Sequence, residues 1–307
     1  MDILDFMKKL REYLKDKEFH SFEELNQAIE KFIEKENQTP FEKFCGLSPY
    51  KMMRFLYFPF DSPDVVSFDI NILPPLDAPF VRLFVLLING IHETKSLKAT
   101  ATGNLPRNFC RELEKAYLSE ADFKFLLRDK FSIMKEQDFF DLHRVRIIAE
   151  MAGYIKKYKK RFILTKRGKN VIAKGFTIDD YLHLLKTFTL RFNWAYFSIL
   201  EEIDIVQDSF LFTLYLLQTF GNKFRPKKFY ADKFITAFSH VLKNIRPHTR
   251  FTSIFEKIIR DTYIWMAIDL FAVAWGFAET KEKSVYLSRF NKYVRKTSFL
   301  DEFIEFK

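Results

Sequence analysis

Apolar residues in the middle of the chain follow a helical spacing up to a glycine, and the spacing then changes. Four apolar side chains between residues 144 and 151 lie close to the three-and-four spacing of one helical face. Gly153 can take the left-handed conformation that often closes a helix. The pattern therefore predicts a helix that ends near Gly153, followed by a β-hairpin with arms at residues 154–155 and 161–165.

The returning arm of this hairpin carries a strand pattern. Phe162 and Leu164 would face one side and Ile163 the other, as a period of two requires. Gly168 would allow the chain to turn out of the strand. Residues 170–173 are then predicted to begin the next helix.

Helical spacing predicts most of the remaining chain as well. Ser21 and Glu24 have the spacing of a capping box, and Thr177 is the expected cap of the helix that follows it. Alternating residues at 65–72 predict an isolated strand. The predicted helices cover residues 2–17, 21–36, 50–56, 77–91, 105–118, 121–128, 139–151, 178–190, 194–205, 209–220, 228–244 and 252–274. Residues 298–306 would form a final helix or be partly disordered.

The helix–glycine–hairpin pattern occurs more than once. A shift of 123 positions places residues 275–277 on 152–154, and residues 286–292 on 163–169. Asn291 then replaces Gly168, an exchange that is compatible with a positive φ.

A shift of 65 positions in the other direction places residues 97–104 on 162–169. Gly90 matches Gly153 if the first hairpin is two residues longer. These matches predict three related hairpins. The alternative is three unrelated β-hairpins whose Gly and Thr residues occupy ordinary turn positions.

The sequence Leu164-Thr-Lys-Arg-Gly-Lys169, after a helix and a hairpin that begins at a glycine, resembles the wing of bacterial winged-helix proteins. The resemblance implies tandem winged-helix-like modules. The wider chain, including Leu47-Ser-Pro49 and residues 58–63, is also similar to an uncharacterised bacterial family, and this similarity implies no activity.

The expected fold class is therefore mainly α with short β-hairpins, arranged as tandem winged-helix-like modules in a compact multi-helical assembly. The 307 residues suggest two or three domains by length alone. We predict an N-terminal helical hairpin at residues 1–46, a first winged-helix-like module at 47–118 and a second at 119–175. Residues 176–307 would form a C-terminal helical domain with a third, degenerate wing-like hairpin.

The amino-acid composition indicates a large hydrophobic core and a net positive charge. Hydrophobic residues make up 48% of the chain, and 38 residues are Phe, which suits a sizeable core. The formal net charge of +10 fits attraction to a polyanion, either nucleic acid or an anionic membrane surface. Lys-rich proteins from AT-rich genomes are also basic without binding either, so the charge alone identifies no partner.

The cellular compartment is predicted from the cysteine count, the N-terminal sequence and the length of the apolar stretches. Cys45 and Cys110 are too few for a disulfide framework or a zinc site, which favours a reducing cytoplasm. No signal peptide is visible. The most apolar stretches, residues 80–91 and 264–277, are too short or too interrupted by charge to span a bilayer, so we expect a cytoplasmic protein without a transmembrane segment.

Positive charge is densest on the central hairpin. Such bases could contact phosphates while a neighbouring helix approaches the major groove, with salt-sensitive and largely sequence-independent affinity. The alternative is a solvated hairpin that is basic for solubility. The candidate nucleic-acid-binding residues are Lys156, Lys157, Lys159, Lys160, Arg161, Lys166, Arg167 and Lys169.

Catalytic and metal-binding patterns are not found, so no catalytic residue, metal or cofactor is expected. The six histidines form no close pair at ligand spacing, and His143 and His183 are interpreted as surface or capping groups. An acidic cluster at residues 201–208 is interpreted as an exposed helix face. Aromatic residues at 188–197 could stack on single-stranded nucleic acid, but at helical spacing they are more typical of a core.

The sequence thus predicts a non-enzymatic protein that binds nucleic acid through its basic wing, with DNA favoured over RNA. The competing hypothesis is a scaffold or adaptor whose winged-helix-like modules bind a protein partner or a second copy, without nucleic-acid binding. Winged helices serve in both roles, and the fold alone does not assign one.

Overall fold

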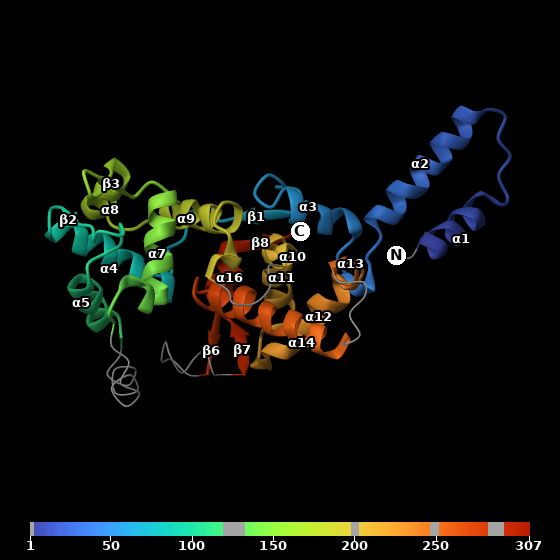
Figure 1. Ribbon diagram of the computed structural model, residues 1–307. Helices are drawn as coiled ribbons and strands as arrows, with labels where there is room; N and C mark the ends of the chain where they lie inside the picture. The colour runs from blue at the N-terminus through green and yellow to red at the C-terminus, as the bar shows by residue number, and fades with distance from the viewer. Residues whose placement is uncertain (1–2, 119–132, 198–202, 246–251, 282–291) are drawn as a thin grey trace.

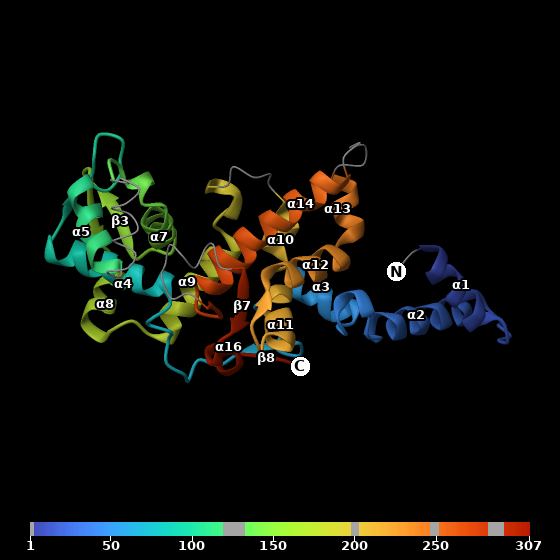
Figure 2. The same ribbon diagram turned by 90° about the horizontal axis from the view of Figure 1, so that it is seen from below.

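The computed structural model describes residues 3–118, 133–197, 203–245, 252–281 and 292–307. The described chain is mainly helical, with one two-stranded and two three-stranded antiparallel sheets, which confirms the expected class. Helices α1 (Ile3–Leu14) and α2 (Phe22–Gln38) project from one end (Figures 1 and 2). Ser21 accepts a hydrogen bond from the amide of Glu24, as the capping spacing predicts.

The first half of the structure contains a sheet built from strands that are distant in sequence. Strand β2 pairs with β4, and β4 pairs with β3, in the order β2-β4-β3. Lys159 and Lys160 form the turn of the central hairpin with φ of 47° and 59°, as a two-residue loop with positive φ at both positions requires. The elements are α4 (Pro79–Glu93), β2 (Leu97–Lys98), α5 (Arg107–Tyr117), η2 (Glu136–Asp138), α7 (Phe140–Met151), β3 (Ile155–Tyr158), β4 (Arg161–Leu164) and α8 (Lys166–Lys174).

The expected first hairpin is wrong. Gly90 lies inside α4, and β2 adds to the central hairpin through the pair Leu97↔Phe162. A Cβ at Gly90 would lie 2.9 Å from the ring of Phe109, so this glycine lets α4 and α5 pack closely and has no role in a turn. The sheet thereby joins residues of the two segments expected as separate modules.

The second half repeats this order of elements. Strand β5 pairs with β7, and β7 pairs with β6, in the order β5-β7-β6. The long helix before this hairpin ends as a π-helix, η4. The elements are α11 (Phe210–Phe220), β5 (Arg225–Pro226), α12 (Lys227–Ala237), α13 (Ser239–Ile245), α14 (Thr252–Tyr263), η4 (Ile264–Val273), β6 (Ala278–Thr280), β7 (Tyr293–Lys296) and α16 (Ser298–Phe303).

Matching hydrogen bonds fix the correspondence between the two repeats. The Thr165 hydroxyl donates to the carbonyl of Gly153 at 2.6 Å, and the Thr297 hydroxyl donates to that of Gly276 at 2.6 Å. Both glycines have positive φ, 75° and 84°. The match of Gly276 with Gly153 is confirmed.

The predicted match of residues 286–292 with 163–169 is wrong at this end of the hairpin. Thr165 follows its glycine by 12 positions and Thr297 follows its glycine by 21, so the second hairpin is longer. Residues 286–291, including Asn291, lie outside the described residues, as does the helix expected at 121–128.

A third sheet joins residues 66–68 to the last strand of the chain. Strand β1 (Val66–Phe68) pairs with β8 (Ile304–Phe306), so the helix expected to reach residue 306 ends at α16 instead. The isolated strand is present but shorter than residues 65–72. Short elements complete the chain: η1 (Glu42–Phe44), α3 (Pro49–Tyr57), α9 (Ile178–Leu190), η3 (Trp194–Phe197) and α10 (Asp204–Asp208).

An aromatic core connects the two repeats through α9. The ring of Phe188 stacks on Trp194 and Trp275, with centroids 4.8 and 5.2 Å apart. The hydroxyl of Tyr181 donates to the carbonyl of Trp275 at 2.8 Å. The interpretation of Phe188, Phe192 and Trp194 as core is confirmed, whereas Tyr196 is 64% exposed.

Candidate nucleic-acid interface

The central hairpin presents one face to the core and one to solvent. Phe162 and Leu164 are buried, and Ile155 is buried opposite Leu164. Because directly paired residues share a face of a sheet, these side chains fix which way the hairpin faces. All eight predicted bases, on β3, the turn, β4 and α8, are exposed.

The outward face of the sheet carries a row of three side chains, one from each strand. Lys98 pairs with Arg161, and Arg161 pairs with Tyr158. All three are exposed, and Tyr158 retains 55% of its accessible surface. Lys156 lies on this face too, two positions before Tyr158. We call Lys98, Lys156, Tyr158 and Arg161 the outer sheet face.

Three of the eight bases contact residues that lie outside β3, β4 and α8. The ammonium of Lys157 lies 3.9 Å from a carboxylate oxygen of Glu150 and donates to the carbonyl of Gly103 at 3.3 Å. Arg161 donates to the hydroxyl of Ser96 at 3.1 Å. The guanidinium of Arg167 lies 5.6 Å from the ring centroid of Tyr154, a cation–π distance.

The other five bases have no carboxylate partner within the described part of the chain. They are Lys156, Lys159, Lys160, Lys166 and Lys169. Their charges are therefore not neutralised by ion pairs with those residues. Positive surface of this kind attracts phosphate through long-range electrostatics.

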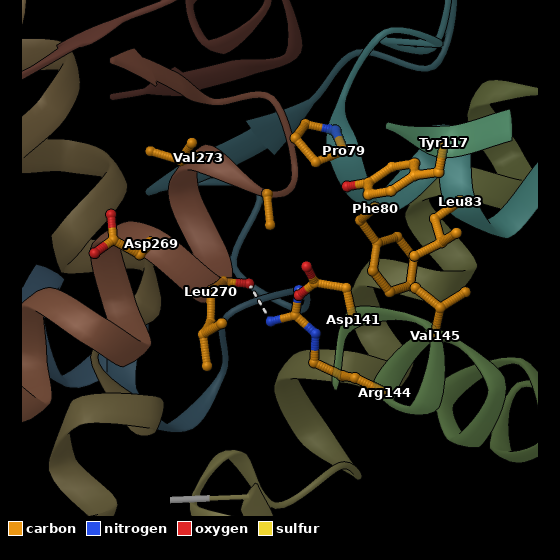
Figure 3. Close-up of a pocket in the computed structure, with 11 residues that line it drawn as sticks. Pro79, Phe80, Leu83, Tyr117, Asp141, Arg144, Val145, Asp269, Leu270 and Val273 are labelled. Carbon is orange, nitrogen blue, oxygen red and sulfur yellow. Dashed lines mark hydrogen bonds and ion pairs between the residues drawn. The ribbon is translucent and has the colours of Figure 1, made fainter. Parts of the chain in front are cut away.

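Helix α7 does not support the expectation of a helix free to enter the major groove. None of its 12 residues is exposed. Arg144 donates to the carbonyl of Leu270 at 3.0 Å, which ties α7 to the π-helix of the second repeat (Figure 3). The 10 residues of η4, the corresponding segment of that repeat, include no exposed residue either.

The contact between the repeats encloses a small cavity of about 40 Å³, lined by α4, α7 and η4 (Figure 3). Arg144 lies beside it, 3.6 Å from Asp141. A cavity of this size holds a water molecule or two and is far below the volume of a ligand pocket. We interpret it as a packing feature of the contact.

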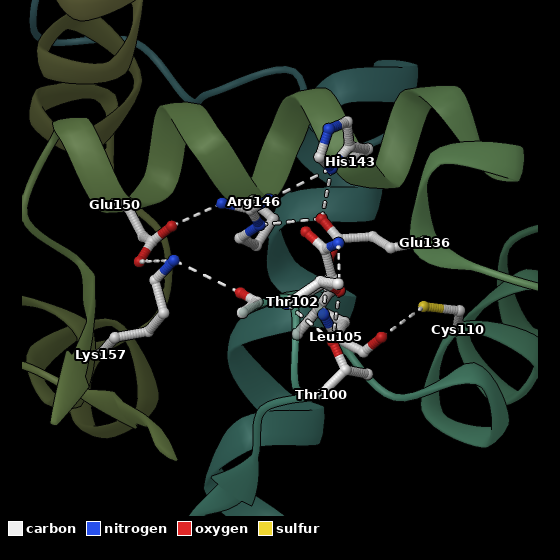
Figure 4. Close-up of polar contacts among 11 residues, drawn as sticks. Thr100, Thr102, Leu105, Cys110, Glu136, His143, Arg146, Glu150 and Lys157 are labelled. Carbon is white, nitrogen blue, oxygen red and sulfur yellow. Dashed lines mark hydrogen bonds and ion pairs between the residues drawn. The ribbon is translucent and has the colours of Figure 1, made fainter. Parts of the chain in front are cut away.

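A buried ionic cluster lies between α7 and the loop that contains Leu105, and it contacts the hairpin through Glu150 and Lys157 (Figure 4). Glu136 is fully buried and accepts hydrogen bonds from Arg146 Nε at 2.8 Å and from the Leu105 amide at 2.5 Å. Its oxygen also lies 2.5 Å from His143 Nδ1. Arg146 binds Glu150 at 2.6 Å in turn. Since Glu150 also contacts Lys157 of β3, the cluster connects α7 to the hairpin.

The pKa of Glu136 reports the balance of forces in this cluster. Desolvation of the buried carboxyl acts to raise its pKa. The hydrogen bond with His143, the charge of Arg146 and the Leu105 amide together outweigh desolvation, so the pKa of Glu136 is lowered. The carboxylate is therefore ionised at neutral pH and pairs with the Arg146 charge.

Sequence analysis missed this cluster and misplaced His143. His143 is 5% exposed and contacts Glu136, so its interpretation as a surface group is wrong. His183 is half-buried, with Nε2 2.9 Å from the carbonyl of Ala152. In the sequence, Glu136 precedes a helix that carries His143 and Arg146 seven and ten positions after it, a spacing that does not predict contact.

Within the described ranges, no three His, Cys, Asp or Glu side chains are grouped so that they could hold a metal ion. Burial raises the pKa of the Cys110 thiol to about 12, so the thiol stays protonated at neutral pH. No helix in the described part of the chain is long and apolar enough to cross a membrane.

The fold and this surface define a mainly helical protein of two similar repeats, the first of which carries a basic hairpin. Residues 76–176 match the family model described as Y4jL N-terminal domain. The matched range contains the whole first repeat, from α4 to α8, and runs through the boundary expected at residues 118–119. Neither a curated protein nor a solved structure matches the chain.

Proposed function

We propose that residues 79–174 and 210–303 are two winged-helix-like modules. The support is the shared order of helix, short strand, helices and hairpin, with the short strand paired to the returning arm in both repeats. The helix before each hairpin would correspond to the recognition helix of such a module. In this chain those two helices contact each other's repeat through Arg144 and Leu270.

We further propose that the protein binds nucleic acid without enzymatic activity, through phosphate contacts of the basic hairpin and the start of α8. The observation that carries the proposal is the group of five exposed lysines with no carboxylate partner in the described chain. Because α7 is covered, the hairpin makes the contacts without a helix in the groove. Phosphate contacts position a protein but carry no direct sequence information, so the affinity is sequence-independent.

Affinity for a mixed-sequence duplex is expected to fall steeply with salt. Five phosphate contacts predict a loss of roughly 500-fold between about 50 and 200 mM salt, because each contact releases condensed counterions. Changing Lys159, Lys160, Lys166 and Lys169 to Glu should abolish binding at the lower salt concentration. Fluorescence anisotropy with a labelled duplex measures both effects.

A matched control is available at the opposite end of the molecule. Lys8, Lys15, Lys31 and Lys35 are exposed on α1, directly after it and on α2, and changing them to Glu alters the net charge equally. This control should keep most of the wild-type affinity, since exposed charges beyond a Debye length are screened. A wild type that binds no duplex at low salt, or two variants that lose affinity equally, would contradict binding through the hairpin.

A second function, that of a scaffold or adaptor, is supported by a different observation. The hairpin of α1 and α2 projects from the body and leaves Phe22 86% exposed (Figure 1). A partner protein or a second copy could cover this end. Light scattering on the wild type and on Phe22→Ser tests self-association; a monomer of unchanged mass in both would remove the second copy as occupant.

A further inference from the structure

We propose that the nucleic acid held by the basic hairpin is single-stranded, and that one of its bases stacks on Tyr158. The inference rests on the proposed function and assigns the class of polymer. It starts from the outer sheet face, where an exposed aromatic ring lies among cations.

The strand register places these groups together. Tyr158, Arg161 and Lys98 occupy directly paired positions on three adjacent strands, so their side chains leave the sheet on the same side. The opposite side is anchored by Phe162, which is fully buried. Tyr158 is therefore directed away from the core, with Lys159 Nζ 5.4 Å from its ring centroid.

An aromatic ring among basic side chains is the arrangement by which proteins bind single strands. The cations follow the phosphates while a base stacks on the ring, and any base can do so because every base has a π-face. On the outer sheet face, Arg161 and Lys98 supply the cations beside Tyr158, and Lys156 lies two positions away.

Duplex nucleic acid cannot use Tyr158 in this way. Its base faces are stacked inside the helix, and only base edges are accessible in the grooves. The element that would approach those edges, α7, has no exposed residue. A duplex therefore gains only phosphate contacts, whereas a single strand gains the phosphate contacts and the stacking on Tyr158.

The second repeat offers a comparison within the same chain. On the sheet β5-β7-β6, Tyr293 is 42% exposed, with Lys281 Nζ 4.9 Å from its ring centroid. Two positions along the strand, Arg295 is neutralised by an ion pair with Glu279 at 2.5 Å. This face thus combines a tyrosine with weaker positive charge, and we assign no strand binding to it.

The test measures Tyr158→Ala, Tyr158→Phe, Tyr158→Trp and Tyr293→Ala against three probes by fluorescence anisotropy. The probes are oligo-dT and oligo-U of about 15 nucleotides, the upper range of single-strand sites, and a mixed-sequence duplex. Tyr158→Ala should weaken binding of the single strands roughly 5- to 150-fold and leave duplex affinity within about twofold. The Phe and Trp variants should keep single-strand affinity, because stacking needs the ring alone.

The control Tyr293→Ala should leave all three affinities unchanged. Circular dichroism verifies that each variant is folded, which the exposure of both tyrosines favours. A greater loss on oligo-dT than on oligo-U would assign the deoxyribose polymer, and the reverse would assign RNA; either supports the stacking. The inference is overturned, while the proposed function stands, if the wild type binds duplex and Tyr158→Ala lowers the affinity for all three probes equally. The same holds if Tyr158→Ala lowers the affinity for none of them. Binding to no probe would overturn both.

Discussion

Replacing Glu136 with Ala is expected to lower the free energy of unfolding by about 3 to 5 kcal/mol, the range for removing one partner of a buried ion pair. Glu136 is fully buried and accepts from the Leu105 amide and from Arg146, and it contacts His143. Without it, the Arg146 charge stays buried with Glu150 as its remaining carboxylate partner. Urea denaturation followed by circular dichroism measures the change.

Glu150→Gln is the matched control within the same cluster. Its side chain is 20% exposed, so water can replace part of the lost interaction with Arg146. A loss of about 1 kcal/mol is expected for this partly solvated pair. If Glu136→Ala cost no more than Glu150→Gln, the cluster would not be the buried support that the structure shows.

The same cluster predicts a pH dependence whose sign follows from the pKa of Glu136. Its pKa is lowered in the folded state, although desolvation alone would raise it. The carboxylate therefore contributes stability above its unfolded pKa of about 4.3, and this contribution is lost as the pH falls through the lower folded value. The difference in free energy of unfolding between wild type and Glu136→Gln should be constant from neutral pH to about pH 5 and shrink below it.

The elements that sequence analysis predicted correctly are those whose causes are local. Gly153 takes a positive φ, and two hairpin strands follow it at residues 155–158 and 161–164. Both features depend on residues within a short stretch, so their order along the chain predicts the structure. The exposure of the eight bases is of the same kind, because an ammonium group is rarely buried without a partner.

The elements that sequence analysis missed depend on residues far apart in the chain. Leu97 was expected on an arm of a separate hairpin, but β2 pairs with β4 instead, with Leu97 opposite Phe162. The apolar spacing of α7 indicated no partner for its arginines. Arg144 reaches a carbonyl 126 positions away, and Arg146 reaches Glu136. No periodicity within α7 could indicate these partners.

The burial of α7 also explains why the hairpin is the part of the first repeat left for binding. Helix α7 packs on α4 and α9, and its Arg144 contacts η4. Strand β3 and helix α8 lie at one end of the molecule (Figure 1). In this chain, therefore, the association of the two repeats and the proposed phosphate binding use different surfaces.

Replacing Gly168 with Ala is expected to destabilise the first repeat by about 3 kcal/mol, at the upper end for overpacking. The sequence predicted that Gly168 allows a turn, but it lies inside α8 and does not have a positive φ. A Cβ there would lie 2.3 Å from the backbone oxygen of Tyr154, which accepts the Thr165 amide at 3.0 Å. Alanine must therefore push α8 away from the hairpin, although it is the better helix former by about 1 kcal/mol.

Gly153→Ala separates this steric effect from backbone strain. Gly153 has φ of +75° and no atom within 4 Å of the position of its Cβ, so Ala there costs only the strain of about 1 to 2 kcal/mol. Urea denaturation of both variants gives the comparison, and Gly168→Ala should be the less stable one. It should also bind duplex more weakly at low salt, because displacement of α8 separates Lys166 and Lys169 from the lysines of the hairpin. Equal stability of Gly168→Ala and wild type would show that α8 does not pack on the Tyr154 carbonyl.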